Sequence, residues 1–148
     1  MIDCHVHTDG YELSDDRSRF DKQLILDFLT NSYWAKDSGA ETIWIGIEGS
    51  AAYGLYTSAG AQVGFVRVIT DGALFARIGH LFVLEEWRGK GLGVWVMKTL
   101  LEDSCLSHIP HWQLSTKDAH NLYERFGFAL NKENDMLMSL ERGIPSGG

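Results

Sequence analysis

The stretch FVLEEWRGKGLGVWV, residues 82–96, constrains the fold more than any other part of the chain. A segment typical of a strand leads through Gly89, Gly91 and Gly93 into an apolar segment typical of a helix. Glycine adopts backbone angles that other residues avoid, so the main chain here can turn sharply and approach a ligand. Because the first turn of a helix leaves N–H groups unpaired at the positive end of its dipole, we expect this loop to bind an anion.

Two common phosphate-binding patterns do not fit this loop. A Walker loop needs Ser or Thr after its lysine, but Gly91 follows Lys90. The dinucleotide fingerprint needs a third glycine at the position where Val96 stands. The pattern that remains is Arg-x-x-Gly-x-Gly, from Arg88 to Gly93, in which Arg88 and Lys90 add positive charge.

Length and composition narrow the class of protein. With 148 residues the chain is expected to form a single domain, 1–148, and is too short for a barrel of eight strands and eight helices. Its formal net charge of -7 disfavours nucleic acid as a partner, and no apolar run approaches the roughly 20 residues of a membrane span. Cys4 and Cys105 are far apart, which indicates reduced thiols and a cytoplasmic location. We expect residues 1–10 to be a leader or edge segment and residues 143–148 to be a flexible tail.

The opening residues raise the alternative of a metal site. On a strand, His5 and His7 would point to the same face and could share one ion, with Cys4 and Asp9 as candidate further ligands. A catalytic zinc needs at least three protein ligands, usually from separate elements. His108 and His111 could in principle join them, but no carboxylate or cysteine cluster is placed to complete the site. We therefore expect no functional metal.

Hydrophobic periodicity predicts strands that alternate with helices in the second half of the chain. A helix is expected over 22–34, with Asp21 as its N-cap. Residues 41–49 are ambiguous, because their isoleucines fit either a strand or a helix. The other predicted elements are strands at 11–16, 51–57, 62–70, 77–86, 111–116 and 136–142, and helices at 94–106 and 118–126, the last one capped by Asp118. Together they predict an α/β fold with a mixed, mostly antiparallel sheet of six or seven strands, flanked by about four helices.

A second motif lies downstream of the glycine loop. The stretch AHNLYERFGF has the form Ala-x-x-x-Tyr-x-x-x-Gly-Phe, with Ala119, Tyr123, Gly127 and Phe128 at the fixed positions. One helix and one strand are predicted between the two motifs. In this order and spacing they resemble the motifs of the Gcn5-related N-acetyltransferase (GNAT) family, whose pyrophosphate-binding loop has the pattern Gln/Arg-x-x-Gly-x-Gly/Ala. The resemblance is firmest over residues 78–128.

The resemblance implies a GNAT-like acyl-CoA N-acyltransferase fold that takes acetyl-CoA as its co-substrate. Main-chain N–H groups of the glycine loop would hold the pyrophosphate of coenzyme A. The strand before the loop would separate from its neighbour and pair with the pantetheine arm. Thr116 stands where the family often has Asn, so this side-chain contact departs from the pattern. The cofactor-binding residues that the resemblance implies are Phe82, Val83, Leu84, Arg88, Gly89, Lys90, Gly91, Leu92, Gly93 and Thr116.

The same resemblance implies the catalytic residues. Tyr123 would protonate the departing thiolate, because a phenol within hydrogen-bond reach is a suitable acid. The attacking amine must lose a proton, since an amine with a pKa of about 10 is almost fully protonated at neutral pH. His80 is the first candidate for the base, because it lies on the strand where related enzymes often place a carboxylate and because histidine titrates in a suitable range. Glu85 and Glu86 are the alternatives.

The expected function is therefore an N-acetyltransferase that moves the acetyl group of acetyl-CoA to the amine of a small molecule by direct attack. The alternative is a non-catalytic acyl-CoA-binding or sensing module on the same fold. Arg77 and Tyr33 are candidates to line the acceptor pocket. The expected partner is a small-molecule amine, with no nucleic acid and no membrane, and the protein is expected to be a monomer or a homodimer.

Overall fold

The computed structural model describes residues 4–32, 39–131, 136, 138–140 and 142. The predicted tail at 143–148 and the pocket candidate Tyr33 lie outside these residues. Among the described residues, every helix is too short or too polar to pass through a lipid bilayer.

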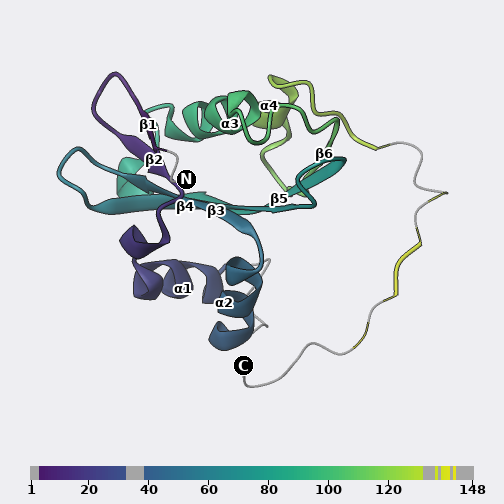
Figure 1. The fold of residues 1–148 in the computed structure, drawn as a ribbon, viewed down its shortest axis with the longest axis horizontal. Coiled ribbons are helices and arrows are strands. Elements are labelled where there is room, and N and C mark those ends of the chain that lie inside the picture. Colours follow the sequence, from purple (N-terminus) through teal and green to yellow (C-terminus); the bar gives the residue numbers. More distant parts are fainter. Residues whose placement is uncertain (1–3, 33–38, 132–135, 137, 141, 143–148) are drawn as a thin grey trace.

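The described strands form one six-stranded sheet in the order of the sequence (Figure 1). Neighbouring strands are antiparallel, except that β5 and β6 are parallel. The strands are β1 (Cys4–Val6), β2 (Glu12–Ser14), β3 (Ala51–Tyr56), β4 (Gln62–Thr70), β5 (Phe75–Val83) and β6 (His111–Gln113). The prediction of a mixed, mostly antiparallel sheet with four helices is confirmed.

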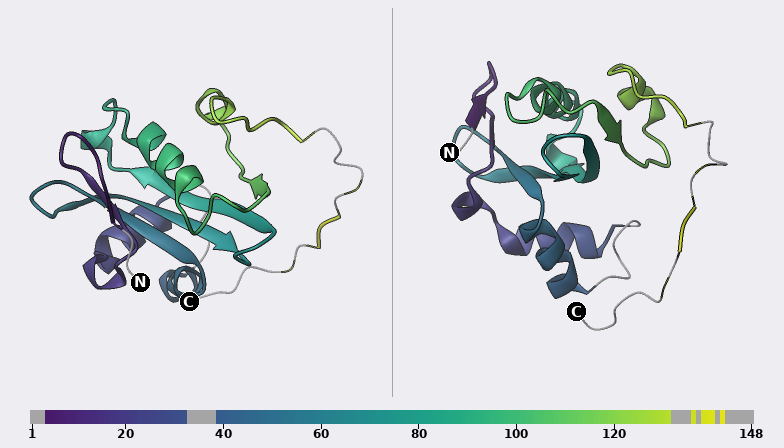
Figure 2. Two further views of the ribbon diagram at one scale, coloured as in Figure 1. Left: turned by 45° about the horizontal axis from the view of Figure 1, so that its top comes forward. Right: turned by 45° about the vertical axis from the view of Figure 1, so that its right-hand side comes forward.

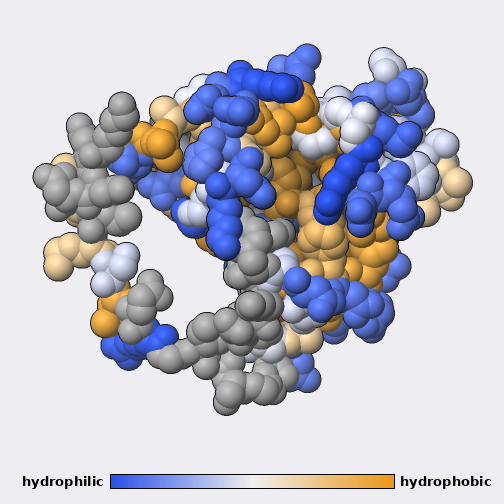
Figure 3. Space-filling view, turned by 180° about the vertical axis from the view of Figure 1, so that it is seen from behind, coloured by the Kyte–Doolittle hydropathy of each residue, from blue (hydrophilic) through white to orange (hydrophobic). Residues whose placement is uncertain are grey.

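The helices cover both faces of the sheet. Helices α1 (Lys22–Thr30) and α2 (Ala40–Glu48) lie on one face, and α3 (Leu92–Glu102) and α4 (His120–Glu124) lie on the other (Figures 1 and 2). Two apolar clusters fill the spaces between the layers. The larger one, which includes Val96 and Leu100, lies under α3, and the smaller one, which includes Phe65 and Phe82, lies under α1 and α2. Figure 3 shows the molecule from behind the view of Figure 1, and on this side apolar residues reach the surface between hydrophilic ones.

Helix α1 begins as predicted and ends earlier. The carboxylate of Asp21 accepts a hydrogen bond from the Leu24 N–H, so Asp21 is the N-cap. The helix ends at Thr30, not at residue 34. Thr30 and Asn31 each donate a side-chain hydrogen bond to a carbonyl of the last turn, and such competing bonds favour termination.

The structure resolves the ambiguous segment 41–49 as helix α2. Ile43 and Ile47 are buried against the sheet, whereas Ile45 is 69% exposed. This spacing of four fits a helix, and in a strand all three side chains would have shared one face.

The first residues form an edge strand. Strand β1 pairs with β2, so residues 4–6 are part of the sheet and the predicted strand at 11–16 is not the first. The side chain of His5 contacts the buried carboxylate of Asp103 at 2.7 Å, and His7 packs against the ring of Trp95. Within the described part of the chain, no three His, Cys, Asp or Glu side chains are grouped to hold a metal ion.

Other boundaries and one cap need correction. Strand β5 covers 75–83 instead of 77–86, β6 covers 111–113 instead of 111–116, and α3 covers 92–102 instead of 94–106. Asp118 does not cap α4; the Thr116 hydroxyl instead accepts a hydrogen bond from the Ala119 N–H.

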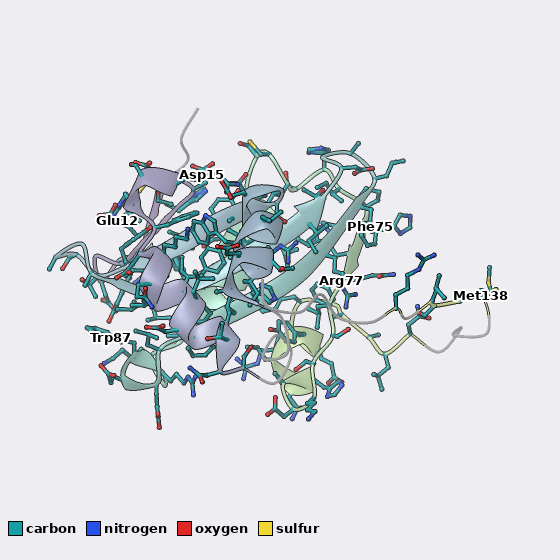
Figure 4. All side chains as sticks on the ribbon, turned by 90° about the horizontal axis from the view of Figure 1, so that it is seen from below. Glu12, Asp15, Phe75, Arg77, Trp87 and Met138 are labelled. Carbon is teal, nitrogen blue, oxygen red and sulfur yellow. The ribbon has the colours of Figure 1, made fainter. Side chains whose placement is uncertain are left out.

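The strand predicted at 136–142 is wrong for the residues described there. Met136, Met138 and Leu140 belong to no strand and are more than three-quarters exposed. In Figure 4, Met138 lies away from the sheet.

Candidate active site

Strands β5 and β6 part soon after they meet. Their parallel pairing covers only three residues of each strand and ends at the pair Arg77–Gln113. Beyond that pair the two segments diverge, and the Nη2 of Arg77 donates to the Ser115 hydroxyl across the fork at 2.8 Å. Because unpaired strand edges carry free N–H and C=O groups, the fork offers main-chain partners to an extended ligand.

A pocket of about 890 Å³ occupies this fork. Its lining comes from five parts of the chain: helix α1, strand β4, strand β5, the glycine loop with the start of α3, and the segment from β6 through α4. Residues that line it include Phe28, Arg67, Arg77, His80, Phe82, Val83, Arg88, Gly93, Thr116 and Tyr123. The structure thus brings both predicted catalytic residues and five of the predicted cofactor-binding residues to one cavity.

The glycine loop presents a row of unpaired N–H groups at one end of this cavity. Gly89 and Gly91 have φ values of 78° and 75°, in the left-handed region that favours glycine. The N–H of Trp95 donates to the Gly91 carbonyl. Among the described residues, no acceptor faces the backbone N–H groups of residues 89–94. Six successive donors at the start of α3 form a cradle suited to an anion.

The end of β5 directs main-chain groups of Val83 into the fork. The Leu84 N–H donates to Val63 on the β4 side, and by the alternation of an antiparallel ladder the polar groups of Val83 face away from β4. The Val83 carbonyl accepts a hydrogen bond from Nε of Arg88. The backbone of Phe82 is paired with Phe65, and its side chain is buried and stacked on Phe28.

A bulge in β5 determines the position of His80. The pairs Phe65–Phe82 and Arg67–Gly79 leave one residue of β4 opposite two residues of β5. His80 is one of those two, and its φ of 57° makes it the one non-glycine residue of the described chain with a positive φ. A bulge re-aims the side chain that it carries, and strained backbone of this kind is often found next to active sites.

The surroundings of His80 keep its imidazole neutral. Burial, together with the positive charge of Arg67, lowers the pKa of His80 to about 4. At neutral pH the ring therefore has a lone pair available to accept a proton. Glu85 and Glu86, the alternative bases, lie in the exposed 3₁₀ turn Glu85–Trp87 and do not line the pocket.

Tyr123 enters the pocket from the opposite wall. It is half-buried on α4, and its ring meets the edge of the Phe128 ring at a centroid distance of 6.1 Å. This contact, between two residues of the second sequence motif, orients the phenol. Thr116 also lines the pocket, with its hydroxyl engaged at the start of α4.

Sequence reasoning missed Arg67 and Phe28, which form the wall below His80. Both line the pocket, and they come from β4 and α1. No local motif marks them, because they meet His80 only through strand pairing and helix packing. Figure 4 shows Arg77 and Trp87, the residue before the Arg88–Gly93 loop, toward opposite ends of the sheet.

Comparisons with known proteins agree with this fold. Residues 39–130 match the model of an acetyltransferase (GNAT) domain. A crystal structure of a GNAT-family protein from Xanthomonas campestris pv. campestris is 36% identical, covers 93% of this chain and 95% of its own, and superposes with a TM-score of 0.82. A crystal structure of a candidate acetyltransferase from Deinococcus radiodurans R1 is 25% identical, and the match covers 96% of this chain and 99% of that one with a TM-score of 0.67. A candidate acetyltransferase of Gibberella zeae is 27% identical over an alignment of 136 residues, and the match covers 78% of this chain and 76% of that protein.

Proposed function

The chain belongs to the GNAT acetyltransferase family, and on that premise we propose that it transfers the acetyl group of acetyl-CoA to the amine of a small molecule. The observation that carries this proposal is the cleft, which joins a row of unpaired backbone donors at one end to a neutral histidine and a tyrosine at the other. Acetyl-CoA supplies the activated acyl group when it is bound.

The residues present fit coenzyme A. A Cβ placed on Gly89, Gly91 or Gly93 would meet nothing within 4 Å, so the space in front of the cradle is open. The N–H groups of residues 89–94 would hold the pyrophosphate, with the charges of Arg88 and Lys90 beside them. The main chain of Val83 would pair with the pantetheine arm, once its carbonyl exchanges Arg88 for the ligand.

In this proposal His80 and Tyr123 move the protons. As the amine nitrogen bonds to the acyl carbon, its N–H becomes more acidic, and a neutral imidazole can then accept the proton directly or through a water. The Tyr123 hydroxyl donates a proton to the sulfur as the C–S bond breaks. Main-chain N–H groups of the fork that face the developing oxyanion would each contribute on the order of 3 kcal/mol.

The test combines binding with turnover. Calorimetric titration should show that the protein binds acetyl-CoA, and release of free thiol should follow when a panel of primary amines is added. Absence of acetyl-CoA binding would contradict the proposal. Tight binding with no thiol release for any amine would instead favour a non-catalytic acyl-CoA-binding module.

A further inference from the structure

The wall of the cleft near His80 carries a guanidinium, that of Arg67, which has no acidic partner among the described residues. Arg67 is half-buried, and none of the ion pairs among the described residues includes it. Its Nε donates to the Ser50 hydroxyl at 2.7 Å, and no acceptor within the described chain faces either Nη. Burial lowers the pKa of Arg67, but an arginine side chain remains charged. The two outer nitrogens of this half-buried cation therefore have no hydrogen-bond acceptor within the described chain and are left for solvent or a ligand.

Helix α2 has a glycine, Gly46, at the point where this guanidinium packs against it. Gly46 lies in the helix interior, where glycine is less stable than alanine by about 0.5–1 kcal/mol. A Cβ at Gly46 would lie only 2.9 Å from Nη2 of Arg67, so the guanidinium packs directly on the helix backbone. The Ser50 hydroxyl, which orients Nε, itself donates to the Gly46 carbonyl. Gly46 and Ser50 thus fix the plane of the Arg67 side chain and leave the edge formed by Nη1 and Nη2 for a ligand.

Arg67 lies at the end of the cleft that contains His80, away from the phosphate cradle. Arg67 pairs with Gly79, the residue before His80. From Gly79 to Val83 the strand extends by about 13 Å, and the phosphate cradle lies beyond Val83. The phosphates of a coenzyme A held there lie at the opposite end of the cleft from Arg67. Two parallel N–H groups of a guanidinium match the two oxygens of a carboxylate.

We propose that Arg67 binds a carboxylate of the acceptor, so that the substrate class is an amine that also carries a carboxylate, as in an amino acid. This inference rests on the proposed acetyltransferase function. Arg77, whose side chain also lines the pocket, adds a second positive charge to the same wall. Binding of the carboxylate would neutralise Arg67 beside His80 and thereby make the imidazole a stronger base.

Matched acceptors test the proposal. Amino acids and their carboxamides are nearly equal in size and differ in charge, and kcat/KM for thiol release is measured for each pair. In the parent, kcat/KM for the acid should exceed kcat/KM for its amide by about 10- to 100-fold, because the amide cannot make the charge-assisted bidentate contact. In Arg67→Gln the ratio of kcat/KM for the acid to kcat/KM for its amide should fall to about one. The ratio is the readout, because loss of the Arg67 charge beside His80 affects both acceptors equally. Arg67→Lys keeps the charge but loses the two parallel N–H groups, so its acid-to-amide ratio should lie between those of the parent and Arg67→Gln. The control Lys98→Gln, on the exposed face of α3, should have the ratio of the parent.

A binding measurement keeps this inference separate from the proposed function. Addition of the amino acid to the coenzyme A complex should shift the Arg67 Nε–H resonance in ¹H–¹⁵N spectra, whether or not turnover occurs. Absence of that shift, or equal kcat/KM for acids and amides, would overturn the inference. A preference for succinyl-CoA over acetyl-CoA that is lost in Arg67→Gln would also overturn it, since the carboxylate would then belong to the donor. Failure of every amine to react, with the shift present, would count against the proposed function alone.

Discussion

The two ends of the cleft are built in different ways. The phosphate cradle is made of backbone N–H groups from six successive residues, 89–94, and its shape depends on two left-handed glycines. The wall proposed to bind the acceptor is made of side chains from α1, β4 and β5, and it is supported by Gly46 of α2 and by Ser50, which follows that helix. A cradle of main-chain atoms can bind the same cofactor in many proteins, whereas a wall of side chains can change its substrate with a few substitutions.

The largest effect is expected from Tyr123→Phe, which removes the proposed proton donor from the end of the cleft opposite the cradle. The ring and its contact with Phe128 remain, and only the proton donor is lost. We expect kcat to fall by about 10²- to 10³-fold with acetyl-CoA affinity unchanged. Tyr56→Phe is the control, because it removes a buried hydroxyl that has no hydrogen-bond partner among the described residues. Equal kcat in the parent and Tyr123→Phe would remove the acid role from this residue.

Gly91→Val tests the cradle by itself. A β-branched residue disfavours the φ of 75°, so the N–H groups should no longer converge, and the Kd for coenzyme A should rise by about tenfold or more. Gly60→Val is the matched control, since Gly60 has a φ of 92° and open space around it but lies in the turn between β3 and β4. Both variants should lose about 1–2 kcal/mol of stability. Similar calorimetric Kd values for the two variants would mean that the cradle does not hold the cofactor.

Gly46→Ala tests the acceptor wall without touching a charged group. The new methyl must push the Arg67 guanidinium out of its plane, so the preference for acids over amides should fall by about three- to tenfold. Helix propensity offsets part of the strain, and the change in unfolding free energy should stay within about 1 kcal/mol. Cofactor affinity should not change. A parent-like acid-to-amide ratio would show that the orientation of Arg67 is not fixed by α2.

The smallest effect concerns the pH dependence of stability. Because the pKa of His80 is about 4 in the folded protein and 6.5 ordinarily, the unfolded chain binds more protons between these values. The contribution of neutral His80 to stability is therefore fully present above pH 6.5 and is lost as the pH falls toward 4. In His80→Gln this loss should be smaller, by on the order of 1 kcal/mol after allowance for partial exposure. Thermal melts at pH 4.5 and 7 measure the loss of stability in the parent, in His80→Gln and in the control His111→Gln, whose histidine is exposed. Equal losses in all three proteins would contradict the burial of His80.

The difference between the two ends also explains what could be predicted from sequence. The cradle is contiguous, so its glycines and the helix that follows them are visible in one short stretch, as is the motif that places Tyr123. Local patterns likewise predicted the β3–β4 hairpin and the N-cap Asp21. Arg67 looks like any strand arginine until pairing sets it beside Gly79 and packing sets it on Gly46.

Errors occurred where the tertiary surroundings decide between local alternatives. Asp118 is a good capping residue, but it is the Thr116 hydroxyl that accepts the hydrogen bond from the Ala119 N–H. The expectation of a leader or edge segment left two possibilities open at residues 4–6, which form an edge strand that pairs with β2 and is tied to the end of α3 through His5 and the buried Asp103. Neither contact leaves a periodic signal, because each joins a single pair of residues.

The most direct test of the central claim follows backbone amides during titration with coenzyme A. In ¹H–¹⁵N spectra of the parent protein, the N–H resonances of residues 89–94 should shift more than those of any other segment and become protected from exchange, as expected for donors that gain a pyrophosphate acceptor. If coenzyme A binds and these six resonances stay in place while others move, the cofactor is held elsewhere and the account of the cleft is wrong.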